Sequence, residues 1–268
     1  MEKHPALWIE YLARIGYVAK GVVYGTVGLL SIQEALDIGG KTTGSEGALR
    51  SIAAQPMGQV LLVLLIIGLV GYVVWRFVQA ILDPEHHSTG LTDIFRRLGY
   101  ATSAVFYSSL AFSAVKILAL PNLDNDDGVT AQAWTARLLV QPLGRWLVGA
   151  VGLFIVGLGC YYFYRAIKAE FRKRFKLHEM SPVEKLWTTI VGRFGIAARG
   201  FVYVMIGTFA IQAAWSFDAS KIETSEGALR SLENNPTDEW VLAIVAIGLI
   251  SYALHMGFQA RYRSIEPR

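Results

Sequence analysis

One stretch of the sequence, Met57–Leu82, contains a single charged residue, Arg76, in 26 positions. This run is longer than the roughly 20 residues with which an α-helix crosses about 30 Å of hydrocarbon. None of the apolar segments alternates apolar and polar residues as a strand of a membrane barrel does. The sequence therefore predicts an all-α integral membrane protein with six transmembrane helices. The other five segments are Ile15–Leu36, Leu98–Leu120, Leu143–Ile167, Phe194–Phe217 and Trp240–Ala260.

The composition supports a membrane protein. Of the 268 residues, 53% are hydrophobic and 17% are charged, which is less charge than a water-soluble domain of this length carries on its surface. The residues before the first apolar segment include Glu10 and Arg14, and no small-x-small cleavage site follows them, so we expect the first helix to be retained. Cys160 is the single cysteine, so no intramolecular disulfide forms.

The basic residues predict an orientation in the membrane. The segments on the N-terminal side of the membrane hold fourteen Lys and Arg residues, whereas the loops on the opposite side hold five. Lys and Arg are enriched in cytoplasmic loops, so we expect both termini to be cytoplasmic. Six further basic residues fall within the apolar segments: Lys20, Arg76, Lys116, Arg145, Arg165 and Arg199.

The chain contains an internal repeat. The sequence SEGALRS occurs at Ser45–Ser51 and again at Ser225–Ser231, and RIGYVAKGVVY, starting at Arg14, matches RFGIAARGFVY, starting at Arg193. A third, more diverged copy starts with RLGYATSAVFY at Arg97. We therefore predict three helical-hairpin repeats, spanning residues 1–92, 93–180 (with a basic cytoplasmic loop) and 181–268. Because each hairpin begins and ends on the same side, the three are parallel, which suggests a pseudo-threefold axis along the membrane normal.

These motifs resemble an uncharacterised bacterial membrane family catalogued as domain of unknown function 1206, whose members look like three consecutive two-helix repeats. The resemblance covers Arg14–Arg263 and rests on the R-x-G…R/K-G-x-x-Y start of the hairpins and on the small-residue G-A-L-R-type loop. The middle repeat departs from the pattern, with Ser103 where the other repeats have Lys20 and Arg199. The resemblance implies the fold and a bacterial cytoplasmic (inner) membrane, and it brings no activity with it.

A short amphipathic helix is predicted at the outer interface of the first and third repeats. A serine followed by an acid suits a helix N-terminus, and an arginine four residues after the acid has the favourable order. Pro56 and Pro236 mark the helix ends, while the middle repeat offers Thr130 as a cap and Trp134 as an interface anchor. Such a helix either closes the hairpin or gates a path. The residues are Ser45 and Ser225 as N-caps, with the pairs Glu46–Arg50 and Glu226–Arg230.

The cations inside the apolar segments are the strongest functional signal. Lys20 and Arg199 occupy one position of the repeat, and Arg76 and Arg165 occupy another. A charge at the centre of the hydrocarbon costs at least about 2.5–3.5 kcal/mol. Two interpretations remain open: these side chains extend to the cytoplasmic headgroups, or they form a cationic ring that binds lipid phosphate or an anionic solute. The residues that share the site in the second interpretation are Tyr24, Tyr107 and Tyr203, one turn from Lys20, Ser103 and Arg199.

The segment Arg165–Met180 carries six basic residues beside Phe171, Phe175 and Leu177. This pattern predicts a basic amphipathic helix lying against an anionic leaflet. Nucleic-acid binding is not expected, because the chain has no separate domain for it.

The sequence gives weak support to metal binding and catalysis. Glu85, His86 and His87 are adjacent and lack further spaced ligands, and the acidic run after Pro121 lacks the glycine register and the final Glu of a calcium loop. His255 is the single histidine within an apolar segment. No P-loop, nucleophile elbow or zinc signature is present. We therefore expect no cofactor, no metal and no enzymatic activity.

Two functional classes remain. One is a protein that binds anionic lipid headgroups or serves as an accessory or scaffold subunit, packing against other membrane subunits. The other is a carrier or channel for a small anionic solute. Mitochondrial carriers also have three parallel hairpins, but their P-x-[DE]-x-x-[KR] motif is absent, so that analogy concerns the fold alone.

Overall fold

The computed structural model describes residues 7–81, 91–120, 127–233 and 239–264. Within these ranges the fold is helical, apart from one isolated antiparallel bridge between Phe175 and Arg263. Six of the described helices contain a stretch that is long and apolar enough to cross a membrane, which confirms the predicted number. They are α1 (Leu7–Ala35), α3 (Gly58–Ile81), α4 (Leu91–Ala119), α6 (Gly144–Lys168), α7 (Pro182–Ser216) and α9 (Glu239–Tyr262).

A short helix separates the two long helices of each repeat. These short helices are α2 (Ser45–Ala53), α5 (Asp127–Leu139) and α8 (Ser225–Arg230). Three 3-10 turns complete the described secondary structure: η1 (Glu170–Arg174), η2 (Leu177–Glu179) and η3 (Ala219–Lys221). The predicted helix end at Pro236 lies outside the described residues.

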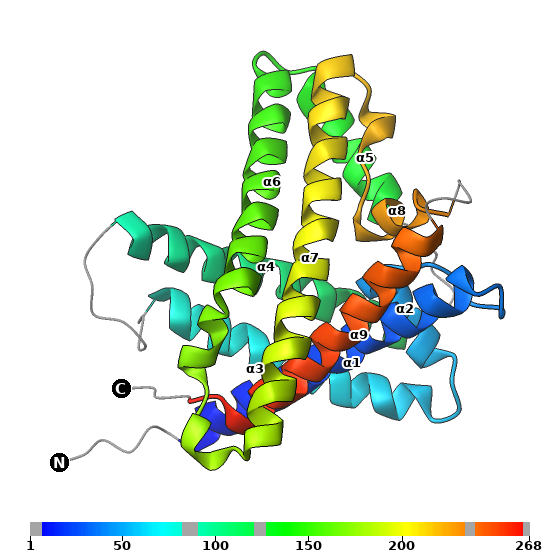
Figure 1. Cartoon of the computed structure of the whole chain (residues 1–268). Coiled ribbons are helices and arrows are strands. Elements are labelled where there is room, and N and C mark those ends of the chain that lie inside the picture. The colour runs from blue at the N-terminus through cyan, green and yellow to red at the C-terminus, as the bar shows by residue number, and fades with distance from the viewer. Residues whose placement is uncertain (1–6, 82–90, 121–126, 234–238, 265–268) are drawn as a thin grey trace.

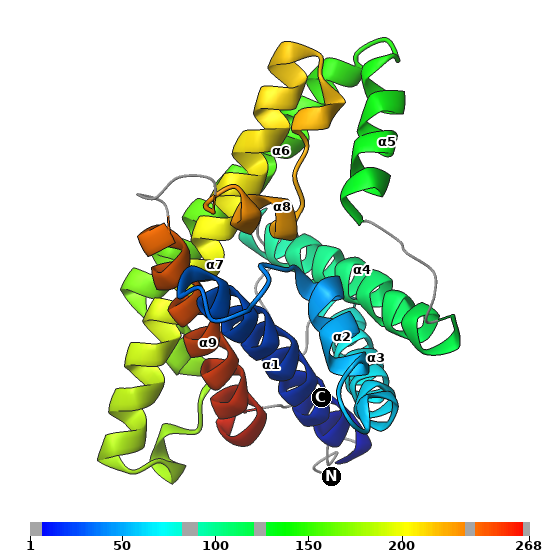
Figure 2. The ribbon, with the colours of Figure 1, turned by 90° about the vertical axis from the view of Figure 1, so that its right-hand side faces the viewer.

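The most extensive helix contacts join different repeats. The last long helix of one repeat packs against the first of the next, as α3 packs on α4 and α6 on α7, and α9 returns to pack on α1. In Figure 1 α6 and α7 stand upright, α3 and α4 run across the view, and α1 and α9 lie on the diagonal. Figure 2 shows the same three pairs from the side. The pairs therefore cross steeply, and the predicted pseudo-threefold axis stays a prediction.

Glycines set the contacts within the first and third repeats. A Cβ on Gly16 would lie 2.7 Å from the Cβ of Tyr72, and a Cβ on Gly195 would lie 2.3 Å from the backbone nitrogen of Tyr252. Only glycine permits this close approach of α1 to α3 and of α7 to α9. The equivalent Gly99 of the middle repeat has nothing within 4 Å of its Cβ position. In the described part of the chain, α4 and α6 therefore lack the close contact that the other two repeats make.

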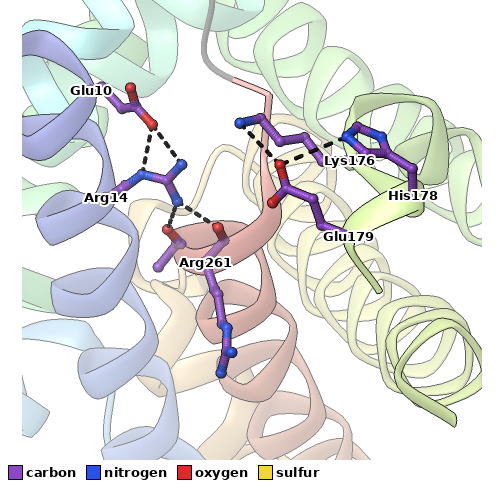
Figure 3. Close-up of polar contacts among 7 residues, drawn as sticks. Glu10, Arg14, Lys176, His178, Glu179 and Arg261 are labelled. Atoms are coloured by element: carbon purple, nitrogen blue, oxygen red, sulfur yellow. Dashed lines mark hydrogen bonds and ion pairs between the residues drawn. The ribbon is translucent and has the colours of Figure 1, made fainter. Parts of the chain in front are cut away.

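The arginine that begins the repeat motif caps the helix of another repeat. Arg14 on α1 donates to the carbonyl oxygens of Ala260 and Arg261 at the end of α9, and Glu10 accepts from the same guanidinium (Figure 3). Arg97 on α4 likewise donates to the last carbonyls of α3. A guanidinium at this place satisfies carbonyls that have no partner inside their own helix. The arginine of the R-x-G motif thus joins one repeat to another, and its glycine sets the close contact within a repeat.

The third-repeat SEGALR segment contacts the start of its first-repeat counterpart. The Glu226 carboxylate on α8 accepts a hydrogen bond from the backbone nitrogen of Gly44 (3.2 Å) and from the Thr43 hydroxyl (3.4 Å). The N-cap positions of α2 and α8 are Gly44 and Thr224, so the prediction that Ser45 and Ser225 are N-caps was wrong by one residue. At α2 a carboxylate from another repeat binds the backbone N–H of the N-cap residue, Gly44. At α8 the extended backbone of Thr224 starts the helix one residue earlier, without a side-chain hydrogen bond.

The ion pairs predicted within the short helices are present. Arg50 lies 3.3 Å from Glu46 and Arg230 lies 2.9 Å from Glu226. In the middle repeat Trp134 on α5 is exposed, whereas the side chain of Thr130 lies outside what the structure describes.

The basic segment after α6 is not the predicted amphipathic helix. Ala169 ends α6 in a left-handed conformation (φ +49°), and η1 and η2 follow. Phe171 and Phe175 are buried against His255 instead of facing lipid. Lys176 donates its backbone N–H to Tyr262, and its side chain joins the Glu179 and His178 group shown in Figure 3. Because both aromatic rings pack inside the protein, the segment does not present them to the membrane.

Candidate functional site

Lys20 lies at the centre of the molecule among tyrosine rings. Its side chain is 2% exposed, and its ammonium donates to the hydroxyl of Tyr72 at 3.0 Å. The same nitrogen lies 4.8 Å from the ring centroids of Tyr72 and Tyr107, 5.4 Å from Tyr252 and 6.0 Å from Tyr24. Four aromatic faces within about 6 Å stabilise a desolvated cation. Lys20 therefore does not extend to the headgroups.

Arg199 is held in the same way by four tyrosines. It is 5% exposed and donates to the hydroxyls of Tyr203 and Tyr252. Its guanidinium carbon lies 5.1–5.3 Å from the rings of Tyr24, Tyr162, Tyr203 and Tyr252. Tyr24 and Tyr252 thus lie between the two buried cations and contact both. The buried hydroxyls serve as hydrogen-bond acceptors, a role that carboxylates would otherwise have to fill.

Arg76 and Arg165 lie nearer the surface and face a cavity. Arg76 donates to the Tyr72 hydroxyl and, at 2.8 Å, to Gln79. The guanidinium of Arg165 lies 5.8 Å from the rings of Tyr161 and Tyr162. Among the described residues no hydrogen-bond acceptor contacts Arg165, and both arginines are half-buried. Their guanidinium groups therefore retain N–H donors that a ligand can use.

The cavity has a volume of about 60 Å³. A single water needs about 10–15 Å³ of such space, so the cavity admits several waters or one small oxyanion. No carboxylate occurs among the described residues that line it. These lining residues are Tyr17, Lys20, Arg76, Tyr100, Ser103, Tyr162, Arg165, Arg174, Ile196, Tyr252, His255, Met256, Gln259 and Arg263.

A polar network closes the inner end of the cavity. Arg263 donates to the amide oxygen of Gln259 (3.1 Å), and the Gln259 amide nitrogen lies 2.8 Å from Nε2 of His255. Because the Gln259 oxygen already accepts from Arg263, its nitrogen donates to His255, which assigns the imidazole proton to Nδ1. Arg174 of η1 also lines the cavity. The segment after α6 therefore contributes a wall of the site.

The structure brings three of the predicted cations together and adds partners that the sequence did not indicate. Lys20, Arg76 and Arg165 meet at one cavity. Tyr24 and Tyr107 lie beside Lys20, whereas Tyr203 contacts Arg199, which does not line the cavity. The missed residues are Tyr72, Tyr162, Arg174, Tyr252, His255 and Arg263. Tyr72 and Tyr252 had a signal, since both end the repeated GLVGY/GLISY motif. No sequence pattern indicated that Arg174 and Arg263 belong to the site, because both lie in segments outside the apolar runs.

Among the described residues, no three His, Cys, Asp or Glu side chains are grouped as metal ligands would be. The adjacent residues Glu85, His86 and His87 lie outside the described residues.

Comparison with known proteins gives the family of the chain. A model of the family described as Domain of Unknown Function (DUF1206) matches three times in tandem, at residues 15–83, 98–169 and 194–263. The chain belongs to this family. It is also 33% identical over 256 residues to "Uncharacterized protein YxxB" of Bacillus subtilis (strain 168), which covers 96% of this chain and 92% of that protein. No solved structure matches the chain significantly.

The cavity is built from all three DUF1206 segments. Lys20 and Arg76 lie in the first segment, Arg165 in the second, and Tyr252 and His255 in the third. The tandem matches agree with the three repeats predicted from the sequence. Since each DUF1206 segment contributes one wall, the cavity requires the whole chain.

Proposed function

We propose that this DUF1206 protein is a multi-pass protein of the bacterial cytoplasmic membrane that binds the phosphate of an anionic lipid headgroup, without catalysing a reaction. In this proposal both termini are cytoplasmic, in keeping with the excess of Lys and Arg on that side. The six apolar helices are consistent with a membrane location. Tyrosine-held cations supply binding energy, and no group acts as a nucleophile or general base.

The observation that carries the proposal is the meeting of Lys20, Arg76 and Arg165 at one cavity with no carboxylate among its described lining residues. Like charges in a medium of low dielectric constant repel each other strongly. A bound anion relieves this repulsion and takes up the donors that the half-buried arginines retain. Arg suits phosphate because its planar group donates two parallel hydrogen bonds.

A second function has support from the same cavity. A carrier or channel for a small anionic solute also needs cations between helices, and parallel repeats around a central site occur in transporters. The same cavity, permanently occupied by lipid, would instead suit an accessory or scaffold subunit that packs against other membrane subunits. We favour lipid binding because the long helices around the cavity carry large exposed apolar residues, against which the acyl chains of a bound lipid would lie.

Native mass spectrometry of the full-length protein tests the proposal. The protein is purified with bound phosphatidylglycerol as the probe, and the retained lipid is compared among wild type, Arg76→Gln and Arg165→Gln. Each variant removes one cation from the cavity, so we expect about tenfold less retained lipid, the effect of one lost charge-assisted hydrogen bond. Arg145→Gln is the matched control, because Arg145 is another α6 arginine with aromatic neighbours and does not line the cavity. Equal retention in all four proteins would contradict the proposal.

A further inference from the structure

The cavity opens on one side of the molecule. The lining residues of α1, α7 and α9 are buried, with Lys20 and Met256 at 2% exposure and His255 at 0%. The partly exposed lining residues come from α3, α4, α6 and η1, namely Arg76, Ser103, Tyr162, Arg165 and Arg174. The mouth of the cavity therefore lies among α3, α4, α6 and η1, and the two long helices of the middle repeat, α4 and α6, form part of its rim.

Two features of the middle repeat explain why the cavity opens beside it. Gly16 and Gly195 lock α1 on α3 and α7 on α9, whereas Gly99 on α4 faces open space. Ser103 replaces the cation found at this repeat position, Lys20 or Arg199, so a small side chain lies at the mouth in place of a third caged cation. The first and third repeats are thus tightly packed within themselves, whereas the middle repeat leaves room beside the cavity.

The helices α4 and α6, beside the mouth, expose many apolar side chains. Of the six long helices, α4 and α6 have the least buried apolar spans, at 28% and 17%, against 44% for α1, α7 and α9. Their exposed side chains include Val105 and Phe106 on α4 and Leu153, Phe154 and Ile167 on α6. A molecule that enters at this mouth therefore comes from the hydrocarbon side and keeps its chains there.

The cavity itself selects the headgroup. A volume of about 60 Å³ admits a phosphate group without a further polar substituent. An ammonium group, as in ethanolamine or choline headgroups, would meet the cations of the lining. A phosphate diester has two ester arms, both of which would have to leave through one mouth, whereas a monoester has one. A monoester also carries between about 1.5 and 2 negative charges at neutral pH.

We propose that the ligand is a membrane amphiphile ending in a phosphate monoester, which enters sideways between α4 and α6 and places its phosphate against Lys20, Arg76 and Arg165. The inference rests on the proposed function and specifies the headgroup and the route. It assigns to α4 and α6 of the middle repeat the role of the entrance. The cations come from the first repeat (Lys20 and Arg76) and from the middle repeat (Arg165), while the third repeat supplies a buried wall.

A ligand series tests the headgroup. The full-length protein in nanodiscs of phosphatidylcholine receives phosphatidic acid, phosphatidylglycerol or inorganic phosphate, and bound lipid is measured by native mass spectrometry. We expect phosphatidic acid to bind about tenfold more tightly than phosphatidylglycerol, as one further charge-assisted hydrogen bond allows, and excess inorganic phosphate not to displace it. Equal binding of both lipids would overturn the inference and leave the proposed function standing. Displacement by inorganic phosphate at similar concentration would overturn it in favour of a free solute. Binding of none of the three would overturn both.

Narrowing the mouth tests the route. Ser103→Phe fills the mouth without removing a cation, and Thr102→Phe places the same ring on the exposed neighbouring position of α4 as the matched control. We expect Ser103→Phe to lose phosphatidic acid binding while Thr102→Phe retains it, with both variants unfolding at the wild-type temperature. Ser103→Leu is the smaller second variant if the phenylalanine destabilises the fold. Wild-type binding by a folded Ser103→Phe or Ser103→Leu variant would overturn the lateral route.

Discussion

At the scale of single residues, the chain keeps two cations inside a membrane-spanning core without a carboxylate partner. Lys20 is 2% exposed and Arg199 is 5% exposed, so neither reaches a headgroup as a snorkelling side chain would. Tyrosine rings supply the negative face of their π systems, and tyrosine hydroxyls supply acceptors. Tyr24 and Tyr252 contact both cations, and the Tyr252 hydroxyl also accepts a hydrogen bond from Arg199.

Removal of the Tyr252 hydroxyl is expected to destabilise the protein. Tyr252→Phe keeps the ring and deletes the acceptor that Arg199 uses, so a buried donor loses its partner. We expect the free energy of unfolding to fall by about 1–3 kcal/mol, which is the cost of an unsatisfied buried donor. The measurement is thermal unfolding in one detergent. Tyr161→Phe serves as control, because Tyr161 is exposed and lies beside Arg165. Similar losses in both variants would show that the hydroxyl of Tyr252 has no special role.

At the scale of elements, the polar residues of the short motifs bind backbone groups of another repeat. Arg14 caps α9 and Arg97 caps α3, and the Glu226 carboxylate of α8 binds the N-terminus of α2. Each contact satisfies backbone groups that a helix leaves without partners at its ends. Such groups are costly where water is scarce. The repeated sequence therefore encodes joints between neighbouring units.

The joint between the SEGALR helices predicts an unequal effect of two substitutions. Glu226→Ala removes the acceptor for Gly44 and Thr43, so we expect a loss of about 1–2 kcal/mol in the free energy of unfolding. Arg230→Ala removes only a half-exposed ion pair (52% side-chain exposure of Arg230), which contributes about 0.3–0.5 kcal/mol. Thermal unfolding of both variants under the same conditions measures the difference. A larger loss for Arg230→Ala would mean that the ion pair, and not the joint, stabilises the outer side.

At the scale of the whole molecule, three crossed helix pairs enclose a site to which every repeat contributes. Two repeats are closed by glycine contacts, and the middle repeat is open at Gly99. Because the middle repeat differs from the other two, the cavity is accessible from one side of the molecule. The short segment of η1 and η2 folds under the helices, bringing Arg174 to the cavity from the loop that follows α6.

Labelling from outside the cell tests the proposed orientation. In a Cys160→Ser background, Gln55→Cys places an exposed thiol after α2 and Lys173→Cys places one in η1. A membrane-impermeant maleimide should label intact cells through Gln55→Cys and leave Lys173→Cys unlabelled until the cells are lysed, because the basic side is expected to be cytoplasmic. The opposite labelling pattern would reverse the orientation and place the cavity near the outer surface.

The sequence by itself determined the number of long helices and the three repeats, because apolar length and internal similarity can be read directly along a chain. It did not determine which helices pair. The R-x-G motif and the SEGALR segments indicate a joint, but their partners, at the end of α9 and at Gly44, are known only once the chain is folded.

The cavity was likewise decided by the tertiary structure. The positions of Lys20 and Arg199 are compatible both with side chains that extend to headgroups and with side chains buried between helices, and only the surrounding tyrosine rings select burial. The basic segment after α6 has the composition of an interfacial helix, yet Phe171 and Phe175 pack against His255. The physical reason is the same in both cases: a cation or an aromatic ring is placed by the competition between lipid and protein surfaces, and the protein surface exists only when all three repeats are assembled.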